Sequence, residues 1–189
     1  MSTSPAGQPL QQRVATAILE GAARTLATQG PAASMSDVAA AAGVARATVY
    51  RYFPTRQVLL DELALLALRE ADERIESARI DEVPIQEAVS RVVRALVEIG
   101  DGFVVLARER ARAADFDRTL AGPLGRLFER GQASGDIRSD LPVSWLREML
   151  LGVALSVLTA KPAQGREDTV AAITSLFLDG ARRREPQPR

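Results

Sequence analysis

The sequence predicts an all-α protein, and three observations support that prediction. Apolar residues recur every three or four positions, as in Leu10, Val14, Ile18, Ala22 and Leu26. Runs that alternate apolar and polar residues between turn residues, which would indicate strands, are absent. The 189 residues are 47% hydrophobic and 25% charged, which is typical of a folded chain with a substantial core. The pattern predicts about nine helices.

The first three helices are expected within the first 54 residues. A helix that begins near residue 10 should stop at Gly30 and Pro31. Ser34, followed three residues later by Asp37, forms a capping-box pattern that opens a second helix over 35–42. Gly43 stands where the residue after a helix end would stand, and a short third helix follows over 45–52.

The remaining helices are delimited by glycine and proline. Pro54 and Thr55 break the third helix and begin a long one over 55–79. Further helices are expected over 84–100, 103–113, 116–133, 142–160 and 167–183. Residues 1–9 and 184–189 are expected to be flexible tails.

Composition excludes several classes of function. The chain has no cysteine and no histidine, so disulfides, Cys/His zinc sites and catalysis by imidazole or thiol are excluded. The longest apolar stretch, 149–158, is too short to span a bilayer, and the first ten residues do not resemble a signal peptide. We therefore expect a cytoplasmic protein with no membrane partner and no cofactor.

The charges are unevenly distributed although they cancel overall. Residues 1–56 contain five arginines and two acidic residues, a net charge of +3, which leaves −3 for the rest of the chain. A basic first quarter followed by an acidic remainder indicates two roles in one chain, the first of them directed at an anionic partner.

Residues 35–54 have the spacing of a helix-turn-helix. Gly43 can adopt the positive φ that a tight turn requires. Ala39, four residues earlier, is small enough for two helices to pack closely, and Val49, six residues later, points back into a core. The second helix can then face outward and enter a DNA major groove about 12 Å wide. An ordinary helical hairpin with a solvated face is the alternative.

The segment GVARATVYRYFPTRQVLLDEL resembles the signature of the TetR/AcrR transcriptional repressors. That resemblance covers roughly residues 10–65 and implies a three-helix DNA-binding domain over 10–54, followed by a helical ligand-binding and dimerisation domain over 55–183. Two positions depart from the family pattern. Ala45 stands where a hydroxyl residue usually caps the recognition helix, and Leu26 stands where phenylalanine is common.

The resemblance also implies roles for individual residues. Ser36 matches a position that reaches a base or a phosphate. The residues that match the base-reading face are Arg46, Ala47, Tyr50 and Arg51, and those that match phosphate contacts are Thr48, Tyr52 and Arg56. An arginine can bond guanine through two hydrogen bonds, and Ala47 can touch a thymine methyl group. Arg56 stands at a helix N-terminus, where a cation opposes the helix dipole and an external anion would explain it.

Two further sets of residues are expected in the second domain. Apolar side chains on its helices are candidates for a ligand pocket, the alternative being that each of them packs the core: Leu63, Leu66, Val92, Leu96, Phe103, Phe116, Leu120, Leu124, Phe128, Trp145 and Met149. The stretch 149–158 is apolar nearly all round, which predicts burial on two sides, one of them at a dimer interface; a central core helix of a monomer is the alternative. The interface candidates are Leu150, Val153, Val157, Ile173 and Phe177.

The expected function is ligand-responsive transcriptional regulation. A homodimer would bind a pseudo-palindromic DNA operator as a repressor, and a small apolar ligand would release it. One alternative is a helical interaction protein without a DNA function. Another is a metal-dependent enzyme that uses carboxylates of the 55–79 helix: Glu70, Asp72, Glu73 and Glu76. Interleaved arginines favour a solvated, salt-bridged helix face over that enzyme.

Overall fold

The computed structural model describes residues 10–109, 113–161 and 163–182. Within these ranges every regular element is helical, apart from an isolated bridge between Ile137 and Arg182. The all-α prediction is therefore confirmed. The expected tails at 1–9 and 184–189, and the positions 110–112, lie outside the described residues.

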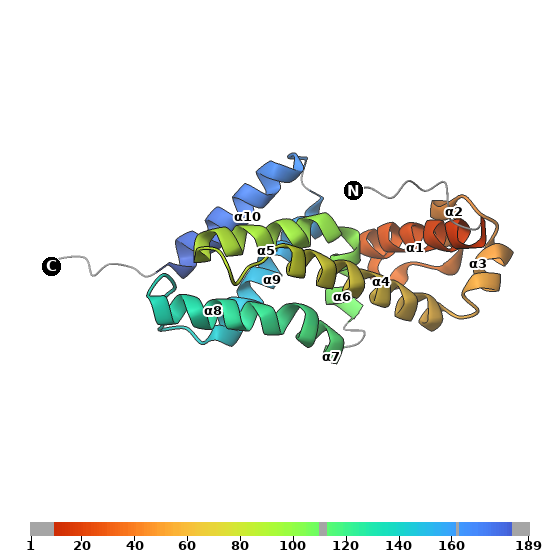
Figure 1. Ribbon diagram of the computed structural model, residues 1–189. Helices are drawn as coiled ribbons and strands as arrows, with labels where there is room; N and C mark the ends of the chain where they lie inside the picture. The colour runs from red at the N-terminus through yellow and green to blue at the C-terminus, as the bar shows by residue number, and fades with distance from the viewer. Residues whose placement is uncertain (1–9, 110–112, 162, 183–189) are drawn as a thin grey trace.

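Three helices form the N-terminal end of the molecule. These are α1 (Leu10–Gln29), α2 (Met35–Ala42) and α3 (Arg46–Tyr52), with a short 3-10 turn (Gly30–Ala32) after α1. Gly21 lets α1 approach α2 closely, because a Cβ atom there would lie 2.9 Å from the backbone nitrogen of Ala42. In Figure 1 the three helices gather at the end of the molecule opposite the C-terminus.

The expected capping signals are present in the structure. The Asp37 amide donates to the Ser34 hydroxyl oxygen at 3.2 Å, and the Ser34 amide donates to the Asp37 carboxylate at 2.9 Å. The Ser34 hydroxyl also donates to the Asp37 carboxylate at 2.6 Å, and this bond, together with the one from the Ser34 amide, lowers the pKa of Asp37 below its ordinary value. Gly43 ends α2 with φ +68°, and Thr55 caps the helix that begins at Arg56 by accepting from the Val58 amide. The capping box and both boundaries are confirmed.

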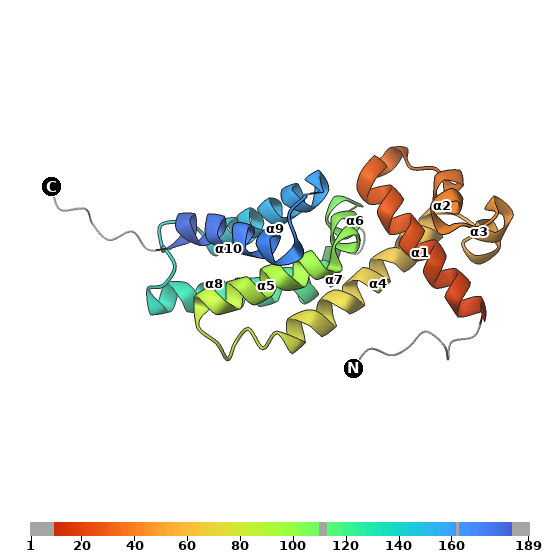
Figure 2. The same ribbon diagram turned by 90° about the horizontal axis from the view of Figure 1, so that it is seen from above.

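Helix α4 (Arg56–Ser77) takes part in both hydrophobic cores. Its first half contributes Leu59, Leu60 and Leu63 to the core of α1, α2 and α3. Its second half, from Ala64 to Ile75, packs into the larger core of the C-terminal helices. Figures 1 and 2 show α4 running from the three-helix end into the C-terminal bundle. A movement of α4 would therefore displace side chains in both cores.

The C-terminal bundle is built from the remaining helices. They are α5 (Ile85–Ile99), α6 (Asp101–Glu109), α7 (Ala113–Phe116), α8 (Gly122–Ser134), α9 (Val143–Ala160) and α10 (Arg166–Ala181). The sequence predicts one helix over 116–133, but a π-helical segment, Asp117–Ala121, interrupts it. There the Gly122 amide bonds back to the Asp117 carbonyl, five residues earlier. Pro123, which has no N–H to continue the regular ladder, follows directly.

Helix α9 is unusually apolar for a helix that is only partly buried. By length and composition it would also pass as a membrane span, with a mean hydropathy of 1.4 over 18 residues. It packs against α5, α6, α8 and α10, which accounts for one side of it. Its other side is exposed in the single chain.

Candidate DNA interface and small-molecule site

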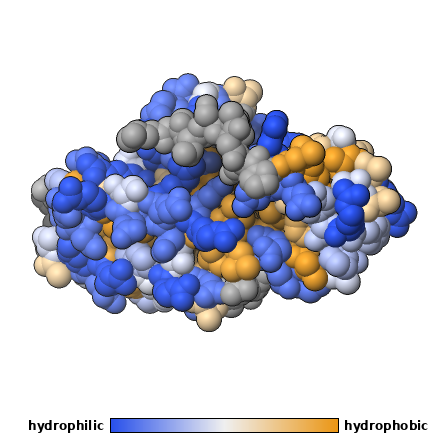
Figure 3. Space-filling view, turned by 45° about the vertical axis from the view of Figure 1, so that its right-hand side comes forward, coloured by the Kyte–Doolittle hydropathy of each residue, from blue (hydrophilic) through white to orange (hydrophobic). Residues whose placement is uncertain are grey.

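Helix α3 is anchored on one side and open on the other. Val49 is fully buried in the N-terminal core, as the spacing predicts. The residues expected to read bases are all exposed on the outer side: Arg46, Ala47, Tyr50 and Arg51. Figure 3, which brings this end of the molecule forward, shows hydrophilic side chains interrupted by apolar patches. An outward polar face on a short, firmly seated helix is suited to groove entry.

Aromatic rings hold the two arginines of this face. The Arg46 guanidinium donates to the Tyr50 hydroxyl at 3.3 Å and lies 5.4 Å from the centre of its ring. The Arg51 guanidinium lies 5.4 Å from the centre of the Tyr52 ring. Such contacts restrict the arginine side chains and keep their charge at the surface. The face is therefore partly ordered before any DNA arrives.

The expected phosphate-binding residues surround that face. Ser36 is exposed in the first turn of α2, while Thr48 and Tyr52 are half-buried along α3. Arg56, the first residue of α4, has a buried Nη2 atom with no hydrogen-bond partner among the described residues. That nitrogen is shielded from solvent in this conformation, so a phosphate oxygen at the N-terminus of α4 would reach it only after the side chain turns outward.

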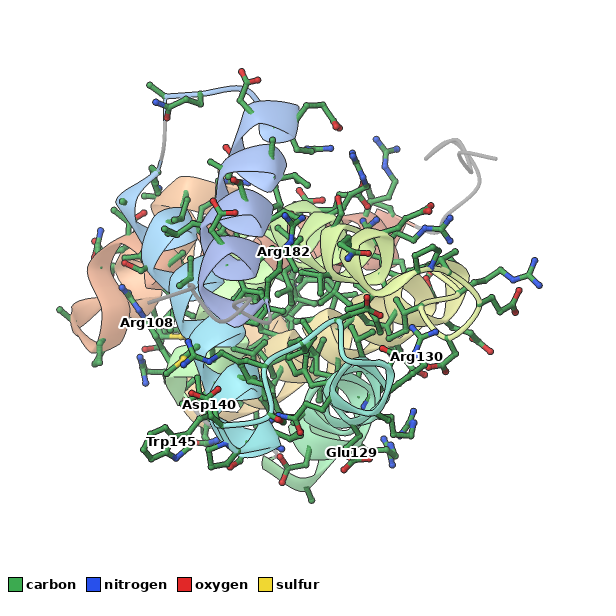
Figure 4. All side chains as sticks on the ribbon, turned by 90° about the vertical axis from the view of Figure 1, so that its left-hand side faces the viewer. Arg108, Glu129, Arg130, Asp140, Trp145 and Arg182 are labelled. Atoms are coloured by element: carbon green, nitrogen blue, oxygen red, sulfur yellow. The ribbon has the colours of Figure 1, made fainter. Side chains whose placement is uncertain are left out.

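The expected pocket residues are distributed among the two cores, two grooves and the exposed side of α9. Seven of them are buried in the two cores, packed against one another: Leu63, Val92, Leu96, Phe103, Leu120, Leu124 and Phe128. Leu66 lines a shallow groove between α1, α4 and the α5–α6 turn. Trp145 and Met149 lie exposed on α9, with Trp145 58% exposed and directed away from the bundle in Figure 4. Apolar periodicity predicts that one face of a helix is buried, but it does not distinguish burial in the core of the same chain from burial against a partner.

A different groove lies between α6, the π-helical segment and α9. Its volume is about 500 Å³, and Phe116 is the one expected pocket residue that lines it. The other walls come from residues that the sequence analysis did not select, among them Leu106, Asp117, Glu148 and Leu155. The glycine and proline after residue 121 were the available signal, because they mark the irregular helix that shapes this groove.

The expected interface residues divide between the core and the surface. Leu150, Ile173 and Phe177 are buried in the protomer's own core, and the Phe177 ring lies 5.5 Å from that of Phe128. Val153 and Val157 are half-buried on α9. The exposed face of the two helices consists instead of Trp145, Met149, Gly152 and Ser156 on α9 with Ala172 and Leu176 on α10. We call these six residues the outer face.

The carboxylates considered for a metal site do not converge. In the part of the chain that the structure describes, no group of three or more acidic residues is arranged to hold a metal ion. Glu70 and Glu73 instead line a groove between α4 and α5 that also contains Arg74, Arg91 and Arg94. Arg74 pairs with Glu98 at 2.6 Å in that groove.

Comparison with known proteins agrees with this geometry. The family model of the bacterial regulatory proteins of the tetR family matches residues 18–63, which include the whole helix-turn-helix. The HTH-type transcriptional repressor LfrR of Mycolicibacterium smegmatis is 30% identical over 173 residues, covering 90% of this chain and 91% of that protein.

Solved structures extend the similarity to the C-terminal bundle. The crystal structure of LfrR from Mycobacterium smegmatis matches with a TM-score of 0.70 at 28% identity, over 90% of this chain and 97% of that one. The LfrR complex with proflavine matches with a TM-score of 0.66 at 30% identity, over 91% and 98%. The ketosteroid regulator KstR2 of Mycobacterium tuberculosis, at 19% identity, shares the fold with a TM-score of 0.72 over 94% and 98%. The chain belongs to the TetR family of bacterial transcriptional regulators.

Proposed function

We propose that this protein is a cytoplasmic repressor that binds a pseudo-palindromic operator as a homodimer and is released by a small molecule. The observation that carries the proposal is the outward face of α3, where Arg46, Ala47, Tyr50 and Arg51 are exposed beside the unpartnered Arg56 nitrogen. A two-fold dimer presents two such faces, and two-fold symmetry in the protein requires two-fold symmetry in its site.

The division of labour along the chain follows from the two cores. We assign DNA binding to residues 10–54, and ligand binding and dimerisation to residues 55–183, of which the structure describes 55–109, 113–161 and 163–182. The relative LfrR is a repressor, and one of its structures holds proflavine. That supports a small-molecule effector here, and the α6–π–α9 groove is the site we assign to it.

Release follows from linkage between the two sites. A ligand that binds more tightly to the conformer with wrongly spaced α3 helices lowers the DNA affinity by the ratio of its two affinities. Two connections can carry that change. One is α4, which joins the cores, and the other is α6, where Arg108 donates to the Ala27 carbonyl at the end of α1.

The test is selection of bound sequences from a random DNA pool, followed by two variants. Arg46→Ala should relax the preference at one base position of each half-site, by about 1–3 kcal/mol. Arg56→Gln should weaken binding to every sequence and reduce the slope of log affinity against log salt by about one unit. Arg126→Gln, which changes an exposed arginine of α8, is the matched control. If Arg46→Ala and Arg56→Gln both bind every DNA sequence as the wild type does, this face is not part of the DNA site.

A further inference from the structure

A continuous series of polar contacts runs along α1, from the end of α9 to the turn of the helix-turn-helix. The first contact is made by Lys161, the C-cap residue of α9, whose Nζ donates to the Thr28 hydroxyl at 2.7 Å. The Thr28 hydroxyl in turn donates to the Arg24 carbonyl at 2.8 Å. The Arg24 guanidinium donates to the Ala41 carbonyl at 2.9 Å, two residues before Gly43. We call Lys161, Thr28, Arg24 and Ala41 the polar line.

The contacts of α1 with α2 and with α9 come from one face of α1. Gly21, Arg24 and Thr28 are separated by three and four residues, so they lie on the same side of the helix. Gly21 packs directly against Ala42, and Arg24 holds the C-terminal end of α2, where the helix dipole favours a cation. Because α3 follows directly after the turn at Gly43, its direction depends on how this end of α2 is seated.

A second contact joins the same ends of α1 and α9. The Arg108 guanidinium of α6 donates to the Ala27 carbonyl at 3.2 Å and to the Thr159 hydroxyl at 3.3 Å. In Figure 2 the ends of α6 and α9 lie beside the end of α1. Helix α9 therefore reaches the N-terminal helices through these side chains as well as through the chain connection that α4 provides.

Lys161 reaches Thr28 from an unusual backbone conformation. It ends α9 in the left-handed region, with φ +50° and ψ 69°. Glycine and asparagine adopt this conformation more readily than other residues, because a larger side chain crowds the backbone there. The only lysine of the chain stands at this position, and its long side chain supplies a donor that neither glycine nor asparagine could extend to Thr28.

We propose that Lys161, Thr28 and Arg24 are positioning residues that fix the spacing between the two DNA half-sites that the dimer accepts. Helix α9 carries most of the outer face and α3 carries the base-reading face, so the polar line joins the two elements whose relative orientation sets that spacing. The inference rests on the proposed function, because it requires a homodimer and a two-fold operator. Each contact is exposed and contributes little to folding, so the polar line acts on orientation.

The test uses the full-length protein and duplexes in which the two half-sites found by sequence selection are separated by spacers of different lengths. Thr28→Val removes the hydroxyl that joins Lys161 to Arg24, and it changes neither the net charge nor the approximate side-chain volume. We expect the preference for the best spacer over the next best to fall by about two- to tenfold, which corresponds to the loss of one hydrogen bond. Affinity for a single half-site should stay at the wild-type value, because the base-reading face of α3 is unchanged.

Matched controls separate the polar line from the substitution itself. Thr174→Val makes the same change at a hydroxyl of α10 that has no hydrogen-bond partner among the described residues, and it should keep the spacing preference. Lys161→Gln should reduce the preference as Thr28→Val does, whereas Lys161→Arg keeps a cationic donor and should preserve it. Arg126→Gln removes a positive charge from α8 and should also preserve it. If Thr28→Val and Lys161→Gln both keep the wild-type spacing preference, the inference is overturned.

A measurement without DNA distinguishes this inference from the proposed function. The chain has no cysteine, so Ala40→Cys, at an exposed position of α2, places a single spin label on each protomer. Pulsed electron paramagnetic resonance then gives the distances between the two labels of a dimer. We expect Thr28→Val to broaden that distribution and Thr174→Val to leave it unchanged. If the distribution broadens but the protein selects no operator, the proposed function fails and the orienting role stands. If the protein binds an operator and Thr28→Val keeps wild-type label distances and spacing preference, the orienting role fails alone.

Discussion

Helix α3 begins without a side-chain cap, because residue 45 is alanine. The backbone of Ala45 already has the extended conformation of an N-cap residue, with φ −68° and ψ 145°. Its methyl group offers no oxygen to the first-turn amides of α3. The Thr48 amide donates to the Ala45 carbonyl at 2.8 Å, and the Arg46 and Ala47 amides are left to water or to a phosphate. This departure from the family pattern therefore affects both the helix and its contact with DNA.

Ala45→Ser should therefore stabilise the helix-turn-helix. A serine hydroxyl at an N-cap contributes about 0.5–2 kcal/mol relative to alanine, and the backbone needs no adjustment to accept it. We expect a higher thermal midpoint and unchanged or tighter operator binding, measured by calorimetry and by fluorescence anisotropy of labelled DNA. Ala45→Val, which adds two methyl carbons but no oxygen, should give no such gain. An equal gain with valine would show that packing, and not capping, limits this turn.

Ser34 and Asp37 provide the contrasting case, a helix start that is fully capped. Ser34→Ala should lower the thermal midpoint, because both hydrogen bonds of the capping box involve Ser34 and its hydroxyl accepts one of them. The Asp37 pKa is lower in the folded state than in the unfolded chain. The contribution of ionised Asp37 to the free energy of unfolding is therefore complete above the ordinary carboxyl pKa. It is lost as the pH falls through the lowered pKa of the folded state. Unfolding followed between neutral and acidic pH should show the gap between variant and wild type narrowing in acid. If the difference in thermal midpoint between variant and wild type stays constant with pH, the ionised Asp37 does not contribute to the cap.

At the scale of elements, the end of α1 is held by two cations from the C-terminal bundle. The Arg108 guanidinium donates to the Ala27 carbonyl at 3.2 Å and to the Thr159 hydroxyl at 3.3 Å. Lys161, the only lysine in the chain, donates from Nζ to the Thr28 hydroxyl at 2.7 Å. Both charges lie where the negative end of a helix dipole favours them. The last turn of α1 is thus fastened to α6 and to the end of α9.

The double variant Arg108→Gln/Lys161→Gln should loosen that turn specifically. Removing both cations leaves the Ala27 carbonyl and the Thr28 hydroxyl to water, so hydrogen exchange in the last turn of α1 should accelerate. Exchange in α8, which contacts neither residue, should remain as in the wild type and serves as the internal reference. The control Arg126→Gln should change exchange in neither place. An unaltered exchange rate in α1 would mean that apolar packing alone holds this end.

Local signals and packing differ in how far the sequence reveals them. The capping box at Ser34, the turn at Gly43 and the buried Val49 were predictable, because caps and turns depend on nearby residues. The groove at Asp117 was not, since it needs the π-helical turn and the approach of α9 from a distant part of the chain. The position of Trp145 was not predictable either, because an aromatic residue on an apolar helix fits a core, a pocket or an interface equally well.

At the scale of the whole molecule, the outer face of α9 and α10 is an apolar surface that the single chain leaves exposed. Trp145 and Leu176 are 58% and 65% exposed, and Met149 is 47% exposed. Three large apolar side chains on two packed helices form a surface that a soluble protein seldom leaves in water. Gly152 and Ala172 are small enough for a second copy of the helix pair to approach closely. We therefore expect the proposed dimer to form through this face, with Leu150, Ile173 and Phe177 supporting it from behind.

Leu176→Glu should separate the dimer without unfolding the protomer. The side chain is exposed in the single chain, so a glutamate there costs little until two copies meet. In the dimer it would bury an unpaired charge, which is strongly unfavourable. Sedimentation velocity should show a monomer at concentrations where the wild type is dimeric. The emission of Trp145, the only tryptophan, should shift to longer wavelength as its ring returns to water. Leu10→Glu, at an equally exposed leucine of α1, should remain dimeric. A dimeric Leu176→Glu protein with wild-type Trp145 emission would place the interface elsewhere on the molecule.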